Sequence, residues 1–145
     1  MQLDMNNKIP HLQRWEQAAI GTLWDYLGYE MVSVSAEEVV VALDIKPHHL
    51  NLIGILHGGA HAAMIDSAMG MIAMLTRPEA DTVTVNLNLN YVAPIKQGRV
   101  LVTAYIVHQS RKMITTQAFA RKENGDLLAM GTGTFRVIDK PAESS

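Results

Sequence analysis

The chain has 145 residues, of which 48% are hydrophobic and 18% are charged, and its formal net charge is −2 at pH 7. This composition is too apolar for a disordered chain and suits one domain with a sizeable core. No basic stripe or polybasic tail points to nucleic acid or to an anionic membrane surface. Cysteine is absent, which excludes disulfides, thiolate metal sites and a cysteine nucleophile; we expect a cytoplasmic protein.

The first third of the chain predicts a helix followed by a strand pair. Apolar residues recur at helical spacing from Pro10 to Tyr26, and Gly28 suits the end of this helix. Two β-rich runs follow at residues 29–35 and 39–45, and the short link between them predicts a hairpin. A polar segment with proline and glycine then predicts an irregular loop.

Residues 57–75 form a long apolar run, which predicts a buried helix that ends before Pro78. Residues 52–75 are long enough to cross a membrane, but they contain His57, His61 and Asp66. A central aspartate costs about 2.5–3.5 kcal/mol on membrane-insertion scales. We therefore expect a core helix and no membrane span.

The second half of the chain predicts four long strands with short links, arranged as an antiparallel meander. In the first strand Val83, Val85, Leu87, Leu89 and Tyr91 alternate with polar residues, which predicts one buried and one solvated face. An Asn-Gly pair at 124–125 predicts a hairpin turn. The predicted strands are residues 82–92, 99–109, 112–122 and 127–138.

These elements together predict one α+β domain over residues 1–145. A curved antiparallel sheet wrapped around the 57–75 helix is the simplest arrangement that buries both. The N-terminal helix adds to this core, and residues 1–9 and 140–145 are expected to be loose tails.

The start and the middle of the 57–75 helix carry residues that a core helix does not need. Gly58 and Gly59 leave backbone N–H groups uncovered at a helix N-terminus, where developing negative charge would be stabilised. The alternative is that these glycines only permit a tight turn into the helix. Asp66 is a carboxylate in an apolar run, and it needs a partner, water or a function.

The spacing of these features predicts a dimer. His57 and Asp66 are nine residues apart, which is about 13–14 Å along a helix and about half a turn around it. Within one chain they cannot reach the same reacting group. In a two-fold dimer with adjacent antiparallel helices, the start of one helix would face Asp66 of the other and create two sites.

A metal site and a serine triad are weaker interpretations. His57 and His61 have the spacing of a metal pair, but Gly58 stands where a zinc protease has glutamate, and no third ligand has a strong spacing. Ser67 lies in no nucleophile elbow. We predict no metal and no cofactor.

Three motifs give the sequence a specific resemblance. They are N-x-x-G-x-x-H-G-G from Asn51, with the carboxylate of Asp66 nine residues after the histidine, then N-L-N-L-N-Y at 86–91 and G-T-G-T-F at 131–135. Residues 28–138 resemble the hotdog-fold acyl-CoA thioesterases of the PaaI type. The resemblance implies dimers with a continuous sheet, often paired into tetramers, and active sites at the dimer interface.

The resemblance also implies roles for individual residues. Asp66 matches the catalytic carboxylate, which is a general base or a nucleophile, and the Gly58 N–H matches the group that polarises the thioester carbonyl. Asn51, from the opposite subunit, matches a residue that orients water or the carbonyl. His57 belongs to the same motif. The segment Ser110, Arg111 and Lys112, together with Gly59, is expected to bind coenzyme A (CoA).

Two departures from the family pattern concern substrate identity. Ser110 stands where many relatives have glycine, and Gly70 stands where aryl-CoA members often have serine or threonine. An aryl or medium-chain acyl-CoA is the expected substrate. The alternatives are an acyl-CoA-binding protein of the same fold without hydrolysis, and a dehydratase of hydroxyacyl thioesters.

Overall fold

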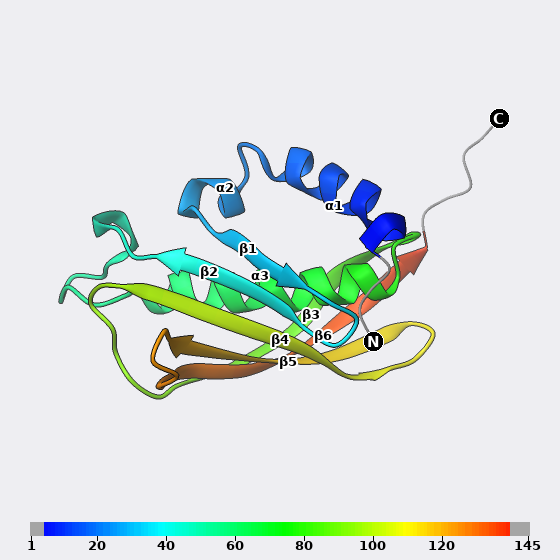
Figure 1. The fold of residues 1–145 in the computed structure, drawn as a ribbon. Helices are drawn as coiled ribbons and strands as arrows, with labels where there is room; N and C mark the ends of the chain where they lie inside the picture. The colour runs from blue at the N-terminus through cyan, green and yellow to red at the C-terminus, as the bar shows by residue number, and fades with distance from the viewer. Residues whose placement is uncertain (1–4, 140–145) are drawn as a thin grey trace.

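The computed structural model describes residues 5–139, with side chains from Leu12 onward. Six antiparallel strands form one curved sheet, α3 lies against it, and α1 and α2 lie on the other side of α3 (Figure 1). This arrangement confirms the predicted α+β hotdog fold. The elements are α1 (Met5–Ala19), α2 (Leu23–Leu27), β1 (Glu30–Val34), β2 (Val39–Asp44), the 3-10 turn η1 (Pro47–His49), α3 (Gly58–Thr76), β3 (Ala80–Tyr91), β4 (Arg99–Gln109), β5 (Met113–Lys122) and β6 (Leu127–Asp139).

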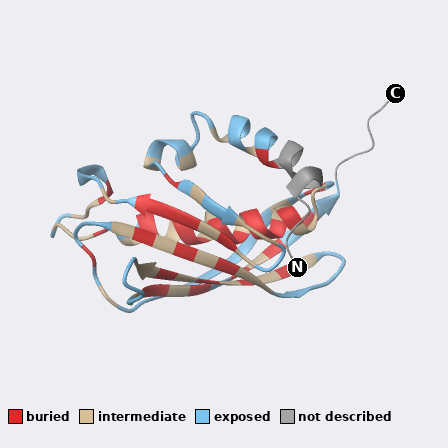
Figure 2. Cartoon of the chain, viewed as in Figure 1, coloured by how far each residue is buried: buried red, intermediate tan, exposed pale blue. Residues whose placement is uncertain are grey.

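The core is built around α3, whose bounds agree closely with the predicted 57–75 helix. Met64, Ile65, Ala68 and Met69 are fully buried, and burial of one large apolar side chain stabilises the fold by about 1.5–3 kcal/mol. Buried residues are concentrated on α3 and on the strands that face it, whereas α1 and α2 are mostly exposed (Figure 2). The long helix is therefore the centre of the hydrophobic core.

The N-terminal helix differs from the prediction in two ways. It begins at Met5, so residues 5–9 of the expected tail are helical; residues 1–4 and 140–145 lie outside the described part. The predicted single helix is interrupted at Gly21, which has φ +78° and separates α1 from α2. Gly28 ends α2 with φ +80°, as expected for a residue in the left-handed region.

The predicted meander is correct only for β4, β5 and β6. The order across the sheet is β1-β2-β4-β5-β6-β3, so β3 pairs with β6 at an edge instead of with β4. Residues 92–98 form a connection that is longer than a common hairpin loop, and they join β3 to β4, from which β3 is separated by β6 and β5 in the sheet. The Val92 N–H donates to the Leu128 carbonyl and the Ile95 carbonyl accepts from Leu56, which fixes this connection.

The predicted alternation of buried apolar and solvated polar residues along β3 is also wrong. Its pairing with β6 shifts between Thr84 and Asn86, which is a β-bulge that changes the face on which later residues lie. Thr84 pairs with Phe135, which is buried beneath α3, whereas Val83 pairs with the exposed Arg136. Val83 and Val85 are 43% and 53% exposed, so the expected apolar face is divided.

We predict that Gly131→Ala lowers the free energy of unfolding by about 1–3 kcal/mol, the usual cost of overpacking. A Cβ at Gly131 would lie 2.8 Å from the Asn88 carbonyl oxygen, which is backbone and cannot easily move. At Gly133 the nearest atom is the flexible Met69 methyl, 2.7 Å away, so Gly133→Ala should cost less. Urea unfolding measures both, with the exposed Thr132→Ala as control; equal losses at 131 and 132 would contradict the packing argument.

Candidate functional site

The start of α3 has one open backbone donor. His57 caps the helix, because its Nδ1 accepts the Gly59 N–H at 2.7 Å. The Gly58 N–H is the first of the helix and has no acceptor within it. A Cβ at Gly59 would lie 2.9 Å from the His57 Nδ1, so this cap requires glycine. Gly58 rather than Gly59 is therefore the donor available to a substrate oxygen.

Tyr91, which the sequence reasoning did not single out, orients Gly58 from β3. Its hydroxyl donates to the Gly58 carbonyl at 2.6 Å, and its ring lies 3.3 Å from the position that a Gly58 Cβ would occupy. The same ring meets the edge of the His61 ring, with 5.6 Å between centroids. The conformation of the glycine pair is thus fixed from the strand side and from the His57 side.

Asn51 shapes the loop that precedes α3. Its Oδ1 accepts the N–H groups of Ile53 at 3.1 Å and Ile55 at 3.2 Å, and its own N–H donates to the Ile55 carbonyl at 2.8 Å. The loop tip is apolar and exposed, with Leu52 fully in solvent. Asn51 and His57 line a shallow hollow of about 550 Å³ beside this tip, called the Asn51 hollow here.

Asp66 lies on the wall of a second hollow, of about 400 Å³, called the Asp66 hollow. Its Oδ1 accepts a hydrogen bond of 2.8 Å from the Thr84 hydroxyl, which the β3 bulge turns toward α3. Ser67 and Gly70 line the same hollow from the next positions on that face of α3. Sequence reasoning missed Thr84, because regular alternation places it on the solvated face.

One chain does not bring all the predicted catalytic residues together. Asn51 and His57 line one hollow and Asp66 lines the other, and no residue is shared between the two linings. This separation agrees with the distance expected from helical spacing. A reacting group that meets both sets of residues needs a second copy of the chain.

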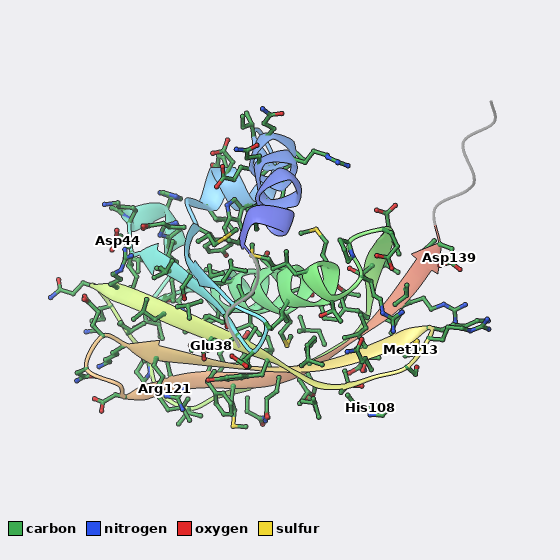
Figure 3. The ribbon with its side chains drawn as sticks, turned by 45° about the vertical axis from the view of Figure 1, so that its right-hand side comes forward. Glu38, Asp44, His108, Met113, Arg121 and Asp139 are labelled. Atoms are coloured by element: carbon green, nitrogen blue, oxygen red, sulfur yellow. The ribbon has the colours of Figure 1, made fainter. Side chains whose placement is uncertain are left out.

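The predicted CoA-binding segment lies in the exposed turn between β4 and β5. Arg77, at the C-terminal end of α3, donates to the backbone carbonyls of Ser110 and Arg111 and so fixes this turn. Arg111, Lys112 and Arg136 line a hollow of about 390 Å³ at the end of the sheet where Met113 and Asp139 are labelled (Figure 3). Asp139 lines the same hollow, and the remaining excess of positive charge favours an anionic ligand such as a phosphate.

The described part of the chain contains neither a group of side chains that could hold a metal ion nor a helix that could span a membrane. Among residues 12–139, whose side chains the structure describes, no three histidine or carboxylate side chains gather closely enough to hold a metal ion. No helix within residues 5–139 is both long and apolar enough to cross a membrane.

Comparison with known proteins identifies the family. The model of the thioesterase superfamily matches residues 53–129, more than half of the chain and most of the site described above. The chain belongs to the thioesterase superfamily. Acyl-coenzyme A thioesterase 13 from Mus musculus is 34% identical over 110 residues, which cover 72% of this chain and 76% of that protein. The chain is therefore a thioester hydrolase.

Solved structures agree with this membership. A thioesterase from Haemophilus influenzae has a TM-score of 0.85 at 20% identity, covers 92% of this chain and 94% of its own, and supports the fold alone. A point mutant of the phenylacetic acid degradation protein PaaI from Thermus thermophilus has a TM-score of 0.72 at 31% identity. That likeness covers 78% of this chain and 96% of the PaaI chain.

We predict that His61→Leu flattens the pH dependence of stability. His61 is 3% exposed, its Nδ1 has no partner among the described side chains, and burial lowers its pKa. Below about pH 6.5 the unfolded chain therefore binds a proton that the folded chain does not, and the free energy of unfolding falls.

Urea unfolding at pH 7.5 and 5.5 measures this effect. At pH 7.5, His61→Leu should be as stable as the wild type or more so, because an unpaired buried polar atom is removed. The exposed His108→Leu serves as control and should keep the wild-type pH dependence. An unchanged difference between the two pH values in His61→Leu would contradict the prediction.

Proposed function

We propose that this protein hydrolyses acyl-CoA thioesters with an apolar aryl or medium-chain acyl group, at sites shared between two copies of the chain. The observation that carries the proposal is Asp66, a hydrogen-bonded carboxylate on the wall of a mostly apolar hollow. The reacting carbonyl, the acyl group and the CoA phosphates of such a substrate each have a counterpart on the chain.

Asp66 is proposed to act on the thioester carbonyl. As a general base it takes a proton from water while the water oxygen bonds to the carbonyl carbon; as a nucleophile its own oxygen forms that bond and water later cleaves the anhydride. In both routes the C–S bond breaks and CoA leaves as thiolate. The Thr84 hydroxyl holds one carboxylate oxygen, which leaves the other for the reaction.

The carbonyl oxygen is proposed to bind the Gly58 N–H of the other copy. Negative charge that develops on this oxygen is stabilised by the open N–H and by the positive end of the α3 dipole. Asn51, in the loop that precedes α3 of that same copy, would orient the thioester carbonyl or the attacking water. Removal of one such donor from an enzyme typically costs about 10²–10³-fold in kcat.

The acyl group is proposed to occupy the Asp66 hollow. Aromatic and thioether side chains line much of it, and its volume of about 400 Å³ lies within the usual range for small-molecule sites. These side chains come from α1, α2, α3 and β6. They are Trp15, Trp24, Met71, Met74 and Phe135.

The CoA phosphates are proposed to bind the cationic hollow of Arg111, Lys112 and Arg136. Phosphate oxygens accept charge-assisted hydrogen bonds from arginine in pairs. Arg77, which fixes the turn through its backbone carbonyls, would preserve the geometry of this hollow. The sequence predicted Arg111 and Lys112 as CoA-binding residues, but it did not single out Arg136 or Arg77.

The second copy is proposed to pair along β3. β3 is an edge strand, so one side of it offers unpaired backbone N–H and carbonyl groups, and Val83, Val85 and Tyr91 on it are about half exposed. Pairing of two such edges would make one continuous sheet and cover these side chains. A further pairing of dimers into a tetramer is the assembly we expect.

Asp66→Asn should lower kcat on the best substrate by about 10²–10⁴-fold, with a smaller change in KM, because the carboxylate acts on the chemical step. A panel of acyl-CoA compounds, followed by thiol release and mass spectrometry, measures this. Glu79→Gln, an exposed carboxylate beyond the end of α3, is the matched control. Full activity of Asp66→Asn would refute the assigned role, and loss of water from the substrate would indicate a dehydratase.

Mixing two inactive variants tests the shared site. Asp66→Asn chains refolded with Asn51→Ala chains should regain activity, because each heterodimer then contains one site with both wild-type residues. Each variant refolded alone should stay inactive and serves as the control. Activity no greater than the sum of the two separate variants would argue against sites shared between chains.

A further inference from the structure

His49 is a buried histidine that the proposed reaction does not use. It ends η1, and its side chain is among the few buried polar groups of the described residues, at 2% exposure. Its Nε2 lies 2.6 Å from the Leu27 carbonyl oxygen at the end of α2, and its Nδ1 accepts the Lys46 N–H at 2.9 Å. This pair of partners requires a neutral ring with the proton on Nε2, since Nδ1 must offer a lone pair.

The backbone of His49 is part of the base of the loop that leads to α3. Its carbonyl accepts the His57 N–H at 2.9 Å, and Leu50 and Leu56 form the next bridge. Residues 49–57 are thus a closed loop, with Asn51 near one end and His57 at the other. The ring of His49 hydrogen-bonds the base of this loop to the end of α2, and the neighbouring His48 ring meets the edge of the Tyr26 ring of α2, with 6.1 Å between centroids.

We propose that His49 is a positioning residue for thioester hydrolysis: its neutral ring fastens the base of the 49–57 loop and so holds Asn51 and the Gly58 N–H in place. This inference rests on the proposed function for its effect on catalysis. The fastening itself rests on the hydrogen bonds and burial alone.

Protonation of His49 would loosen the base of the loop, because a protonated Nδ1 cannot accept the Lys46 N–H, and only the bond from Nε2 to the Leu27 carbonyl would remain. Several groups near the His49 ring affect its pKa. Burial and the charges of His48 and Lys46 lower the pKa of His49, while its hydrogen bond to the Leu27 carbonyl raises it, and the net direction is downward. This loosening is therefore an acid-side event, below the ordinary histidine pKa of about 6.5.

Three variants test the proposal on the full-length protein. His49→Leu removes both ring hydrogen bonds, and His49→Asn keeps an acceptor near the Nδ1 position and does not titrate. The control is His108→Gln, which changes an exposed histidine on β4. Steady-state kinetics with the best acyl-CoA from pH 5 to 8.5 give kcat and KM. Hydrogen exchange by mass spectrometry follows the amides of residues 46–57 without reference to activity.

His49→Leu should lower kcat by about 10–100-fold, the scale of a misplacement near 1 Å, with a smaller change in KM and faster exchange over 49–57. His49→Asn restores the bond to the Lys46 N–H but not the bond to Leu27, so it should recover part of kcat and lose the part of the acid limb that comes from His49. His108→Gln should match the wild type in both measurements.

Wild-type kcat and exchange in His49→Leu would overturn the proposal, as would an acid limb that is the same in His49→Asn as in the wild type. If His49→Leu fails to fold, His49→Asn still decides through its pH profile and exchange. If the wild type cleaves no thioester, the proposed function fails, while the exchange measurements still show whether His49 fastens the loop.

Discussion

The α3 helix is apolar or small around most of its circumference, so nearly every side of it must be covered. The sheet covers one side, and the aromatic side chains of the N-terminal segment cover much of another: Trp15 and Trp24 meet edge to face at 4.5 Å, and the Tyr29 hydroxyl donates to the Ala60 carbonyl. Two parts of α3 stay accessible, its first turn and the strip that contains Asp66 and Gly70. The candidate site lies where the coverage of this helix ends.

Sequence periodicity predicted the individual elements well because each depends on local pattern and punctuation. The long helix begins and ends one residue after its predicted bounds, since Gly58 and Pro78 mark its ends. The place of β3 could not be predicted in the same way. It depends on hydrogen bonds that residues 92–98 make with Leu128 and Leu56, and these partners are remote in sequence.

The residues of the candidate site differ in the same way: some are marked by local sequence pattern, and others depend on contacts between remote parts of the chain. His57, Gly58 and Asp66 were recognisable because glycine pairs and a carboxylate are unusual in an apolar helix. Thr84 gave no signal, because its direction depends on a bulge that the alternating pattern conceals. His49 gave none either: two adjacent histidines in a polar segment look alike, and only the fold buries one of them and leaves His48 exposed.

The bulge in β3 changes which residues of that strand lie on the same face. Thr84 and Tyr91 are an odd number of positions apart, so a regular strand would point them to opposite faces. With the bulge both face α3, where one binds Asp66 and the other binds Gly58. One strand thus binds α3 at two points, the Asp66 carboxylate and the helix start. The number of residues between its two contacts must match the spacing of these points along α3. Removal of one residue at the bulge would change no chemical group of the site, yet only one of the two contacts could then be made.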